Sequence, residues 1–211
     1  MRITILITLL LAVLICSAQE KTRFVTDSSG FFSQRYHVLK SDQDVMHGKY
    51  IKSFYGRILF VGEYEYGERK GVWTFYDGDR WGGSYTYDYD TSDVVEYTPG
   101  DTVCNLPEQP DRPPLLAGSF TELRFRIADN IKYPDIAKYE GTSGTVTVSF
   151  TIDELGYPVD FDISRGVSPE LDAEALRLVT ESVTGMLWIP AVKDEKKIRC
   201  RMSLPVRFVA Y

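Results

Sequence analysis

The stretch Gly144-Thr-Val-Thr-Val-Ser-Phe-Thr-Ile-Asp153 decides the fold of the C-terminal half of this chain. Its apolar side chains alternate with small hydroxyl side chains, which is typical of a strand with one buried face. The run Asp153-Glu-Leu-Gly156 has the composition of a turn, and the same alternation returns at Val159, Phe161 and Ile163. These segments predict an antiparallel hairpin.

Helical patterns flank this hairpin on both sides. Leu123, Ile127 and Ile131 share one face of a predicted helix, and Pro134 ends that helix at the preceding residue. Pro134 can also open a short helical turn through Ile136 and Ala137. A second helix is predicted from Ser168, because serine is a favoured N-cap and a proline and several acidic residues follow it in the first turns.

A last strand is predicted from Ile198 to Phe208, because alternate residues of this segment are apolar. The order helix, strand, strand, helix, strand predicts an α+β C-terminal domain over residues 119–211, with a three-stranded antiparallel sheet and two helices on one face. The intervening residues of the last strand point the other way: Arg199, Arg201, Ser203, Pro205 and Arg207.

The N-terminal half has a different composition. Residues 48–97 are rich in aromatic residues and glycine and show no helical periodicity, which predicts short strands joined by tight turns. A Gly-x-aromatic pattern recurs at Gly48, Gly62, Gly71 and Gly83, so hairpin repeats are expected. Residues 19–98 are therefore predicted to form a mostly-β repeat domain that precedes the C-terminal domain.

Residues 99–118 separate the two halves. Pro107, Pro110, Pro113 and Pro114 lie close together in this segment, and prolines disfavour regular structure because they have no backbone N–H. The segment is predicted to be a Pro-rich linker that acts as a short, semi-rigid spacer.

The N-terminus has the layout of a secretory signal. Arg2 precedes an apolar run, and small residues follow that run up to Ala18. We predict that residues 1–18 form a signal peptide and that the protein is exported. The alternative is an uncleaved inner-membrane anchor, although the run is shorter than the ~20 residues of a membrane-spanning helix.

Charge and cysteine content narrow the function classes. The chain has 24 Lys and Arg against 30 Asp and Glu, a net charge of −6 at pH 7, and no basic stripe that would bind nucleic acid. Export permits a disulfide between Cys104 and Cys200, whereas the alternative for Cys200 is a buried apolar role in the last strand. No catalytic, phosphate-binding or metal-binding motif is found, so we predict no enzyme activity, cofactor or metal site.

Part of the N-terminal half resembles a known repeat. The stretches His47-Gly-Lys-Tyr50 and Gly62-Glu-Tyr-Glu-Tyr-Gly-Glu-Arg-Lys-Gly-Val-Trp73 are similar to variant MORN repeats of bacterial surface and periplasmic proteins, over about residues 30–90. This resemblance implies a structural and interaction module without catalysis.

Several motifs stand in order along the C-terminal half: Tyr133-Pro-Asp-Ile-Ala137, Gly144–Asp153, Gly156, Arg165–Leu176, Trp188-Ile-Pro-Ala191 and Ser203-Leu-Pro-Val-Arg-Phe208. With these motifs, this half resembles the C-terminal domain of TonB over about residues 119–211. The resemblance implies a periplasmic domain that binds a short N-terminal segment of an outer-membrane transporter and passes force from an inner-membrane proton-driven complex, for energy-coupled uptake of nutrients or siderophores.

The expected partner-binding residues lie at two places. Pro205 has no N–H to give to a sheet, so the last strand is predicted to be an edge strand that can accept an added strand. The alternative is that its arginines discourage edge-to-edge aggregation. The resemblance places the receptor contact near Tyr133 and Pro134 as well as on the last strand, where the outward-facing residues are Arg199, Arg201, Ser203 and Arg207.

The chain departs from the resembled family in its short Pro-rich spacer and its short N-terminal apolar run. These departures concern force transmission and leave peptide binding untouched. The alternative function is therefore a non-transducing envelope scaffold that binds other proteins through both modules.

Overall fold

The computed structural model describes residues 20–76, 83–99 and 110–210 of the 211-residue chain. The predicted signal peptide, residues 1–18, lies outside these ranges, and so does Cys104. Cys200 is buried at the first position of the last strand. The disulfide between Cys104 and Cys200 therefore stays a prediction.

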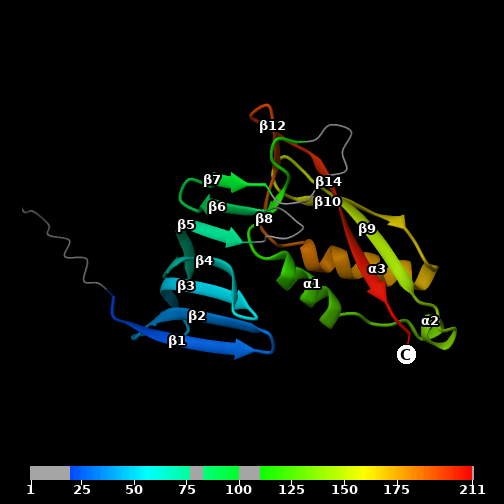
Figure 1. Ribbon diagram of the computed structural model, residues 1–211, viewed down its shortest axis with the longest axis horizontal. Helices are drawn as coiled ribbons and strands as arrows, with labels where there is room; N and C mark the ends of the chain where they lie inside the picture. Colours follow the sequence, from blue (N-terminus) through cyan, green and yellow to red (C-terminus); the bar gives the residue numbers. More distant parts are fainter. Residues whose placement is uncertain (1–19, 77–82, 100–109, 211) are drawn as a thin grey trace, which may run out of the picture.

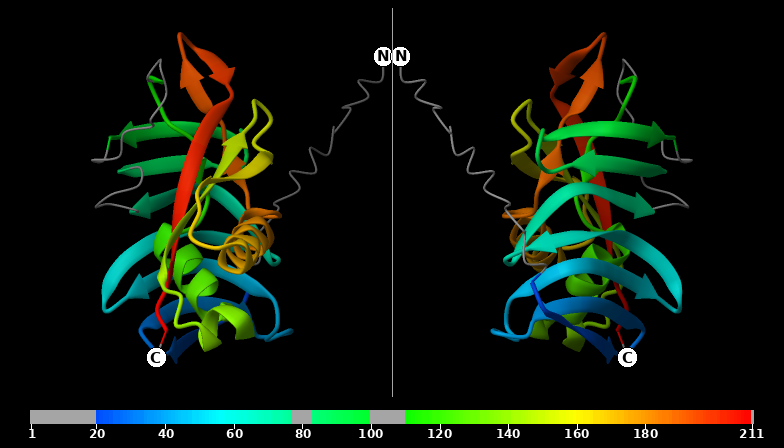
Figure 2. Two further views of the ribbon diagram at one scale, coloured as in Figure 1. Left: turned by 90° about the vertical axis from the view of Figure 1, so that its right-hand side faces the viewer. Right: turned by 90° about the vertical axis from the view of Figure 1, so that its left-hand side faces the viewer.

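The N-terminal part is one antiparallel sheet, here called the large sheet, in which each strand pairs with the next along the chain (Figures 1 and 2). The strand-rich character expected from the aromatic and glycine content is confirmed, whereas the MORN-like identity stays a prediction. Within the described ranges its strands are β1 (Thr22–Ser29), β2 (Phe32–Leu39), β3 (Met46–Phe54), β4 (Arg57–Glu65), β5 (Glu68–Tyr76), β6 (Ser84–Asp88) and β7 (Asp93–Thr98).

Two of its hairpins turn on the same pair of residue types. Tyr55-Gly56 joins β3 to β4, and Tyr66-Gly67 joins β4 to β5. Both residues of each pair have positive φ: 48° and 79° in the first turn, 49° and 88° in the second. Two consecutive positive φ values define the type I′ turn, which matches the twist of the strands that it joins. The glycine content of this half therefore serves tight turns, as predicted.

Gly62 is required for a different reason. A Cβ at this position would lie 2.1 Å from the indole ring of Trp73, so only glycine leaves room for that ring. Trp73 is fully buried, and its indole N–H donates to the carbonyl of Glu63 at 3.1 Å. The Arg69 guanidinium lies 4.5 Å from the centre of the same ring. One of the predicted Gly-x-aromatic repeats thus positions the central side chain of this core.

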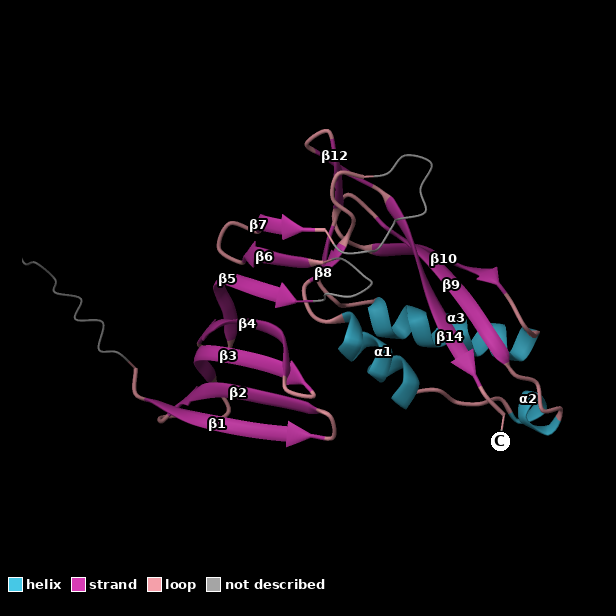
Figure 3. Ribbon diagram, viewed as in Figure 1, coloured by secondary structure: helices cyan, strands magenta, loops and turns pink. Residues whose placement is uncertain are grey.

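The C-terminal part is the expected α+β layer, and the helices of the described chain are confined to it (Figure 3). Its sheet has the order β10-β9-β14, with both pairings antiparallel, which confirms the predicted three-stranded sheet. Its principal elements are α1 (Phe120–Asp129), α2 (Asp135–Tyr139), β9 (Gly144–Ile152), β10 (Pro158–Arg165), α3 (Pro169–Val183) and β14 (Cys200–Phe208).

The element counts differ from the prediction of two helices. The first helix ends at Asp129, so Ile131 follows it, although Ile131 still packs against the core. The short α2 is a third helix of the described chain, at the place where a helical turn after Pro134 was expected. A small hairpin, β12 (Ala191–Lys193) with β13 (Lys196–Ile198), occupies the segment in which the last strand was expected to begin. Two consecutive residues with positive φ, Asp194 and Glu195, form its turn.

Serine caps begin both long helices. The Ser119 hydroxyl accepts from the backbone N–H of Thr121 at 3.1 Å, and the Ser168 hydroxyl accepts from that of Leu171 at 3.4 Å. Such caps satisfy N–H groups that have no partner inside the helix. The predicted start of the second helix at Ser168 is confirmed, and its predicted apolar stripe is fully buried: Leu171, Ala175, Leu178 and Val179.

A two-residue strand pair joins the two parts. β8 (Leu115–Leu116) lies within the segment predicted as linker, yet both of its residues are buried, and it pairs with β11 (Trp188–Ile189). Leu115 and Ile189 pack into the core of the large sheet, whereas Leu116 and Trp188 pack into the core of the α+β layer. The C-terminal end of the linker segment therefore belongs to both cores, while the boundaries of the predicted domains stay a prediction.

Candidate partner-binding site

β14 is an edge strand of the three-stranded sheet, as the proline in it indicates. Among the described strands it pairs only with β9, and Pro205 lies opposite Thr147. An antiparallel ladder alternates between residue pairs that exchange two main-chain hydrogen bonds and pairs that exchange none. Because proline cannot donate, the pair Pro205–Thr147 belongs to the second kind.

A second proline fixes the same alternation from the opposite side of β9. Pro158 of β10 lies opposite Ile152, so the main-chain groups of Ile152 face β14, where Cys200 is its partner. Both prolines therefore indicate that the main-chain N–H and C=O groups of Cys200 and Met202 face β9 and bond within the sheet. The main-chain N–H and C=O groups of Arg201 and Ser203 face the open edge.

The side chains of the predicted arginines extend across the sheet face. Arg201 donates to the carboxylate of Asp162 at 2.5 and 2.6 Å, and this hydrogen bond raises the pKa of Arg201. Arg199 donates to Asp160 at 2.5 Å, and it precedes β14 rather than lying within it. Both aspartates belong to β10, on the far side of β9. The side chains of these two arginines therefore lie across the face of the sheet and leave the edge main chain open.

The other two predicted edge residues differ from this pair. The hydroxyl of Ser203 lies 2.8 Å from that of Ser149 on β9, so its side chain also stays within the sheet. Arg207 is exposed, and its side chain forms no ion pair with any residue that the structure describes. Of the predicted arginines, Arg207 is the one whose charge remains available to a partner.

A groove of about 180 Å³ lies between β14 and α1. Ile127 and Ile131 give it an apolar wall, and Arg124 and Arg207 bring positive charge to it. A strand that paired with β14 would lie in this groove, with alternate side chains toward α1. The sequence prediction missed this wall. The signal was present in the helical stripe of Leu123, Ile127 and Ile131, but only the fold brings that stripe beside β14.

Tyr133 and Pro134 lie at the end of β14. The Tyr133 hydroxyl donates to the carbonyl of Thr142, and its ring packs edge-on against that of Phe208, with 5.8 Å between the ring centres. Pro134 is the N-cap residue of α2. The structure thus brings both residues to the end of the strand and does not place them along its open edge.

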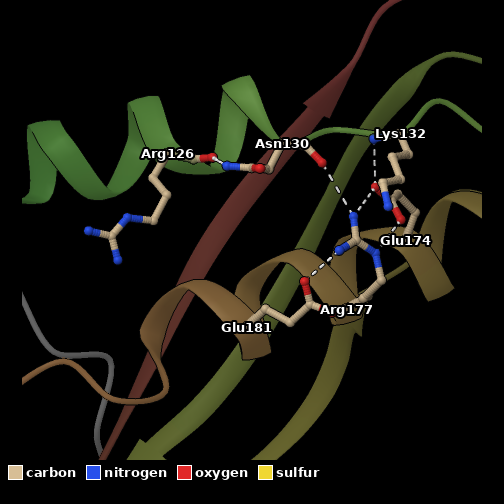
Figure 4. Close-up of polar contacts among 6 residues, drawn as sticks. All are labelled: Arg126, Asn130, Lys132, Glu174, Arg177 and Glu181. Atoms are coloured by element: carbon tan, nitrogen blue, oxygen red, sulfur yellow. Dashed lines mark hydrogen bonds and ion pairs between the residues drawn. The ribbon is translucent and has the colours of Figure 1, made fainter.

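A polar network fixes the connection that leads from α1 to Tyr133 (Figure 4). Glu174 of α3 accepts from the backbone N–H of Lys132 at 2.7 Å and from Arg177 at 2.8 Å. Arg177 also donates to the carbonyl of Asn130 at 3.3 Å and to Glu181 at 2.5 Å. This network ties the chain on both sides of Ile131 to α3, and so it supports the apolar wall of the groove.

Residues 20–76, 83–99 and 110–210 contain no cluster of three or more His, Cys, Asp or Glu side chains that could hold a metal ion. No helix in these ranges has the length and apolarity that crossing a membrane requires.

Residues 129–210 match the family model of the Gram-negative bacterial TonB protein C-terminal. TonB C-terminal domains are non-enzymatic interaction domains, which confirms for this region the prediction that the protein is not an enzyme. They interact in general with outer-membrane receptors, and proteins of this family are envelope or periplasmic proteins.

Two solution structures of the Helicobacter pylori TonB C-terminal domain are similar to this chain. The longer form has 22% identity and a TM-score of 0.35, and the similarity covers 43% of this chain and 79% of that one. The shorter form has 24% identity and a TM-score of 0.31, with 42% and 89% covered. A search of curated proteins finds no match.

The TonB match divides the candidate site into two parts. β14, Tyr133 and Pro134 lie inside the matched residues, whereas α1 lies almost wholly before them and the large sheet precedes them entirely. The strand edge is thus the TonB-like part of the site, and Arg124 and Ile127 of the groove wall come from outside the match.

Proposed function

We propose that this protein is exported to the periplasm and binds the N-terminal segment of an outer-membrane transporter, which adds as a strand to the open edge of β14. The observation that carries this proposal is an edge strand whose outward main-chain groups border an apolar groove. Main-chain hydrogen bonds supply affinity in such a mode, and the groove selects side chains.

The TonB-like match supports the partner class, because domains of that family interact with outer-membrane receptors. The groove adds a preference of its own. An apolar wall with Arg124 and Arg207 beside it favours a peptide that has apolar residues on one face and acidic residues at its margins.

The test uses synthetic peptides from the N-terminal segments of the TonB-dependent transporters encoded in the same genome, with affinity measured by fluorescence anisotropy. Ser203→Pro removes an outward N–H and should weaken binding about tenfold, the effect of losing roughly 1.4 kcal/mol.

Ser203→Ala is the matched control, because it removes the hydroxyl that contacts Ser149 but keeps the N–H. If a folded Ser203→Pro variant binds the peptides with unchanged affinity, the binding surface lies elsewhere than on β14. Energy coupling is tested separately, by measuring uptake of the transporter's substrate in cells whose only copy of this protein is the Ser203→Pro variant.

A non-transducing envelope scaffold is the second candidate. Val72 and Tyr76 of β5 are exposed, while the alternating Trp73 and Phe75 are buried, so the outer face of the large sheet carries apolar side chains. Pull-down from envelope extracts separates the two functions. Transporters captured by the wild type and lost with Ser203→Pro favour the first, and partners insensitive to that substitution favour the scaffold.

A further inference from the structure

A second groove lies against α1, between this helix and the end of β3 in the large sheet. It has a volume of about 400 Å³, and Phe54, Thr121 and Phe125 line it together with Arg124 and Ala128. Because Phe54 belongs to the large sheet and the other residues belong to α1, the groove exists only where the two parts meet.

Aromatic side chains surround this groove. The Phe125 ring lies 5.2 Å from the rings of both Phe54 and Phe32, measured between ring centres. At its margin, Phe31 and Tyr55 stack at 4.7 Å although they are 52% and 70% exposed. Exposed aromatic side chains beside a groove are typical of a surface that binds a partner.

The two grooves lie side by side on α1. Arg124 and Ala128 line both of them, and Figure 1 shows α1 between the large sheet and β14. Thr121 and Ala128 are about 10 Å apart along the helix axis, at 1.5 Å per residue. An extended chain covers that distance in roughly three residues. A peptide that leaves the edge of β14 and crosses Ala128, whose side chain is small, therefore reaches the far end of the second groove at Thr121 within about three further residues.

Charge at the crossing favours an acidic peptide. Arg124 is exposed and forms no ion pair among the described residues, whereas Lys52 nearby pairs with Glu122 at 3.1 Å. Arg199 and Arg201 are likewise occupied by Asp160 and Asp162. Arg124 is thus a cation without a counter-ion in the path between the two grooves.

We propose that the peptide that adds to β14 continues across α1 and places a large apolar side chain, aromatic or branched, in the groove between β3 and α1, with an acidic residue against Arg124. This inference rests on the proposed function. It assigns to the large sheet a role in partner selection, because Phe54 and the exposed aromatic side chains lie outside the TonB-like match.

The experiment compares two peptides from one transporter segment: a short peptide that covers only the pairing stretch, and a long peptide that adds the native residues on both sides. Thr121→Trp fills the second groove without touching β14. Thr121→Val is the control, because valine has nearly the same volume as threonine and leaves the groove open. Thr121→Arg is a second filling variant, in case the indole disturbs the start of α1.

The long peptide should bind wild-type protein about tenfold more tightly than the short one, consistent with burial of one large apolar side chain. Thr121→Trp should abolish this difference in affinity and leave binding of the short peptide unchanged. Ser203→Pro should weaken binding of both peptides. Equal affinities of the two peptides, or a long peptide insensitive to both filling variants, would overturn the inference while leaving the strand edge intact. If neither peptide binds, or Ser203→Pro affects neither, the proposed function itself fails.

Discussion

At the scale of single residues, Glu174 is an acidic side chain that stabilises the fold through hydrogen bonds, one of them to a distant part of the chain. The sequence explains it only as an acidic residue near the start of a helix, where the helix dipole favours negative charge. In the fold it accepts hydrogen bonds from the Lys132 N–H and from Arg177. Burial raises the pKa of Glu174, but these donors lower it more, so its pKa lies below the ordinary 4.5.

We expect Glu174→Gln to destabilise the protein at neutral pH by about 1–3 kcal/mol, the range for a broken charged hydrogen bond. A depressed pKa in the folded state contributes stability above the ordinary value, and that stability is lost as the pH falls through the folded pKa. The difference between variant and wild type should therefore shrink below about pH 4. Urea unfolding at several pH values measures it.

Glu181→Gln is the control for this prediction. Glu181 also pairs with Arg177, but its side chain is 64% exposed. Exposed ion pairs contribute little, so this variant should change stability by less than about 1 kcal/mol. Equal losses for the two variants, or a Glu174→Gln loss that is constant with pH, would contradict the assigned role.

At the scale of elements, the orientation of β14 determines which main-chain groups are available to a partner. The prolines of β10 and β14 assign the N–H of Met202 to the sheet and that of Ser203 to the open edge. Adjacent residues of one strand should therefore respond very differently to proline.

Met202→Pro should cost about 3 kcal/mol more than Met202→Ala, because it removes a ladder hydrogen bond and forces the ring against β9. Ser203→Pro should cost only about 1 kcal/mol more than Ser203→Ala, because its N–H bonds nothing in the sheet. The alanine variants remove the side-chain contributions from each comparison. Thermal unfolding checks the values, and a reversed order would mean that the edge faces the other way.

Elements also show what the sequence could predict. The alternation from Cys200 to Phe208 depends on neighbouring residues alone, so the buried and exposed faces of β14 were predictable. The ion pairs of Arg201 with Asp162 and the wall that Ile127 supplies depend on residues far apart in the chain. The last strand begins at Cys200 and not at Ile198, because Ile198 ends β13, which pairs with β12 instead of β9.

At the scale of the whole molecule, β8 and β11 join two cores that the sequence separates by a proline-rich segment. Two hydrogen bonds strengthen the junction from the large sheet: Arg69 donates to the carbonyl of Ala117 at 2.9 Å, and the Tyr85 hydroxyl donates to that of Leu116. Lys52 and Glu122 add an ion pair between β3 and α1. The aromatic groove that we assign to partner selection depends on this junction, since its walls come from both parts.

The two parts should therefore unfold together, and the neighbours Leu115 and Leu116 test this. Each is 1% exposed, but Leu115 faces the core of the large sheet and Leu116 faces that of the α+β layer. Leu115→Ala and Leu116→Ala should each cost about 2–5 kcal/mol, the range for a truncated buried leucine. Hydrogen exchange followed by mass spectrometry should show faster exchange in β4 and in β9 for both variants, because one strand pair carries both side chains. Exchange that rises only in β4 for Leu115→Ala and only in β9 for Leu116→Ala would show that the two parts open independently.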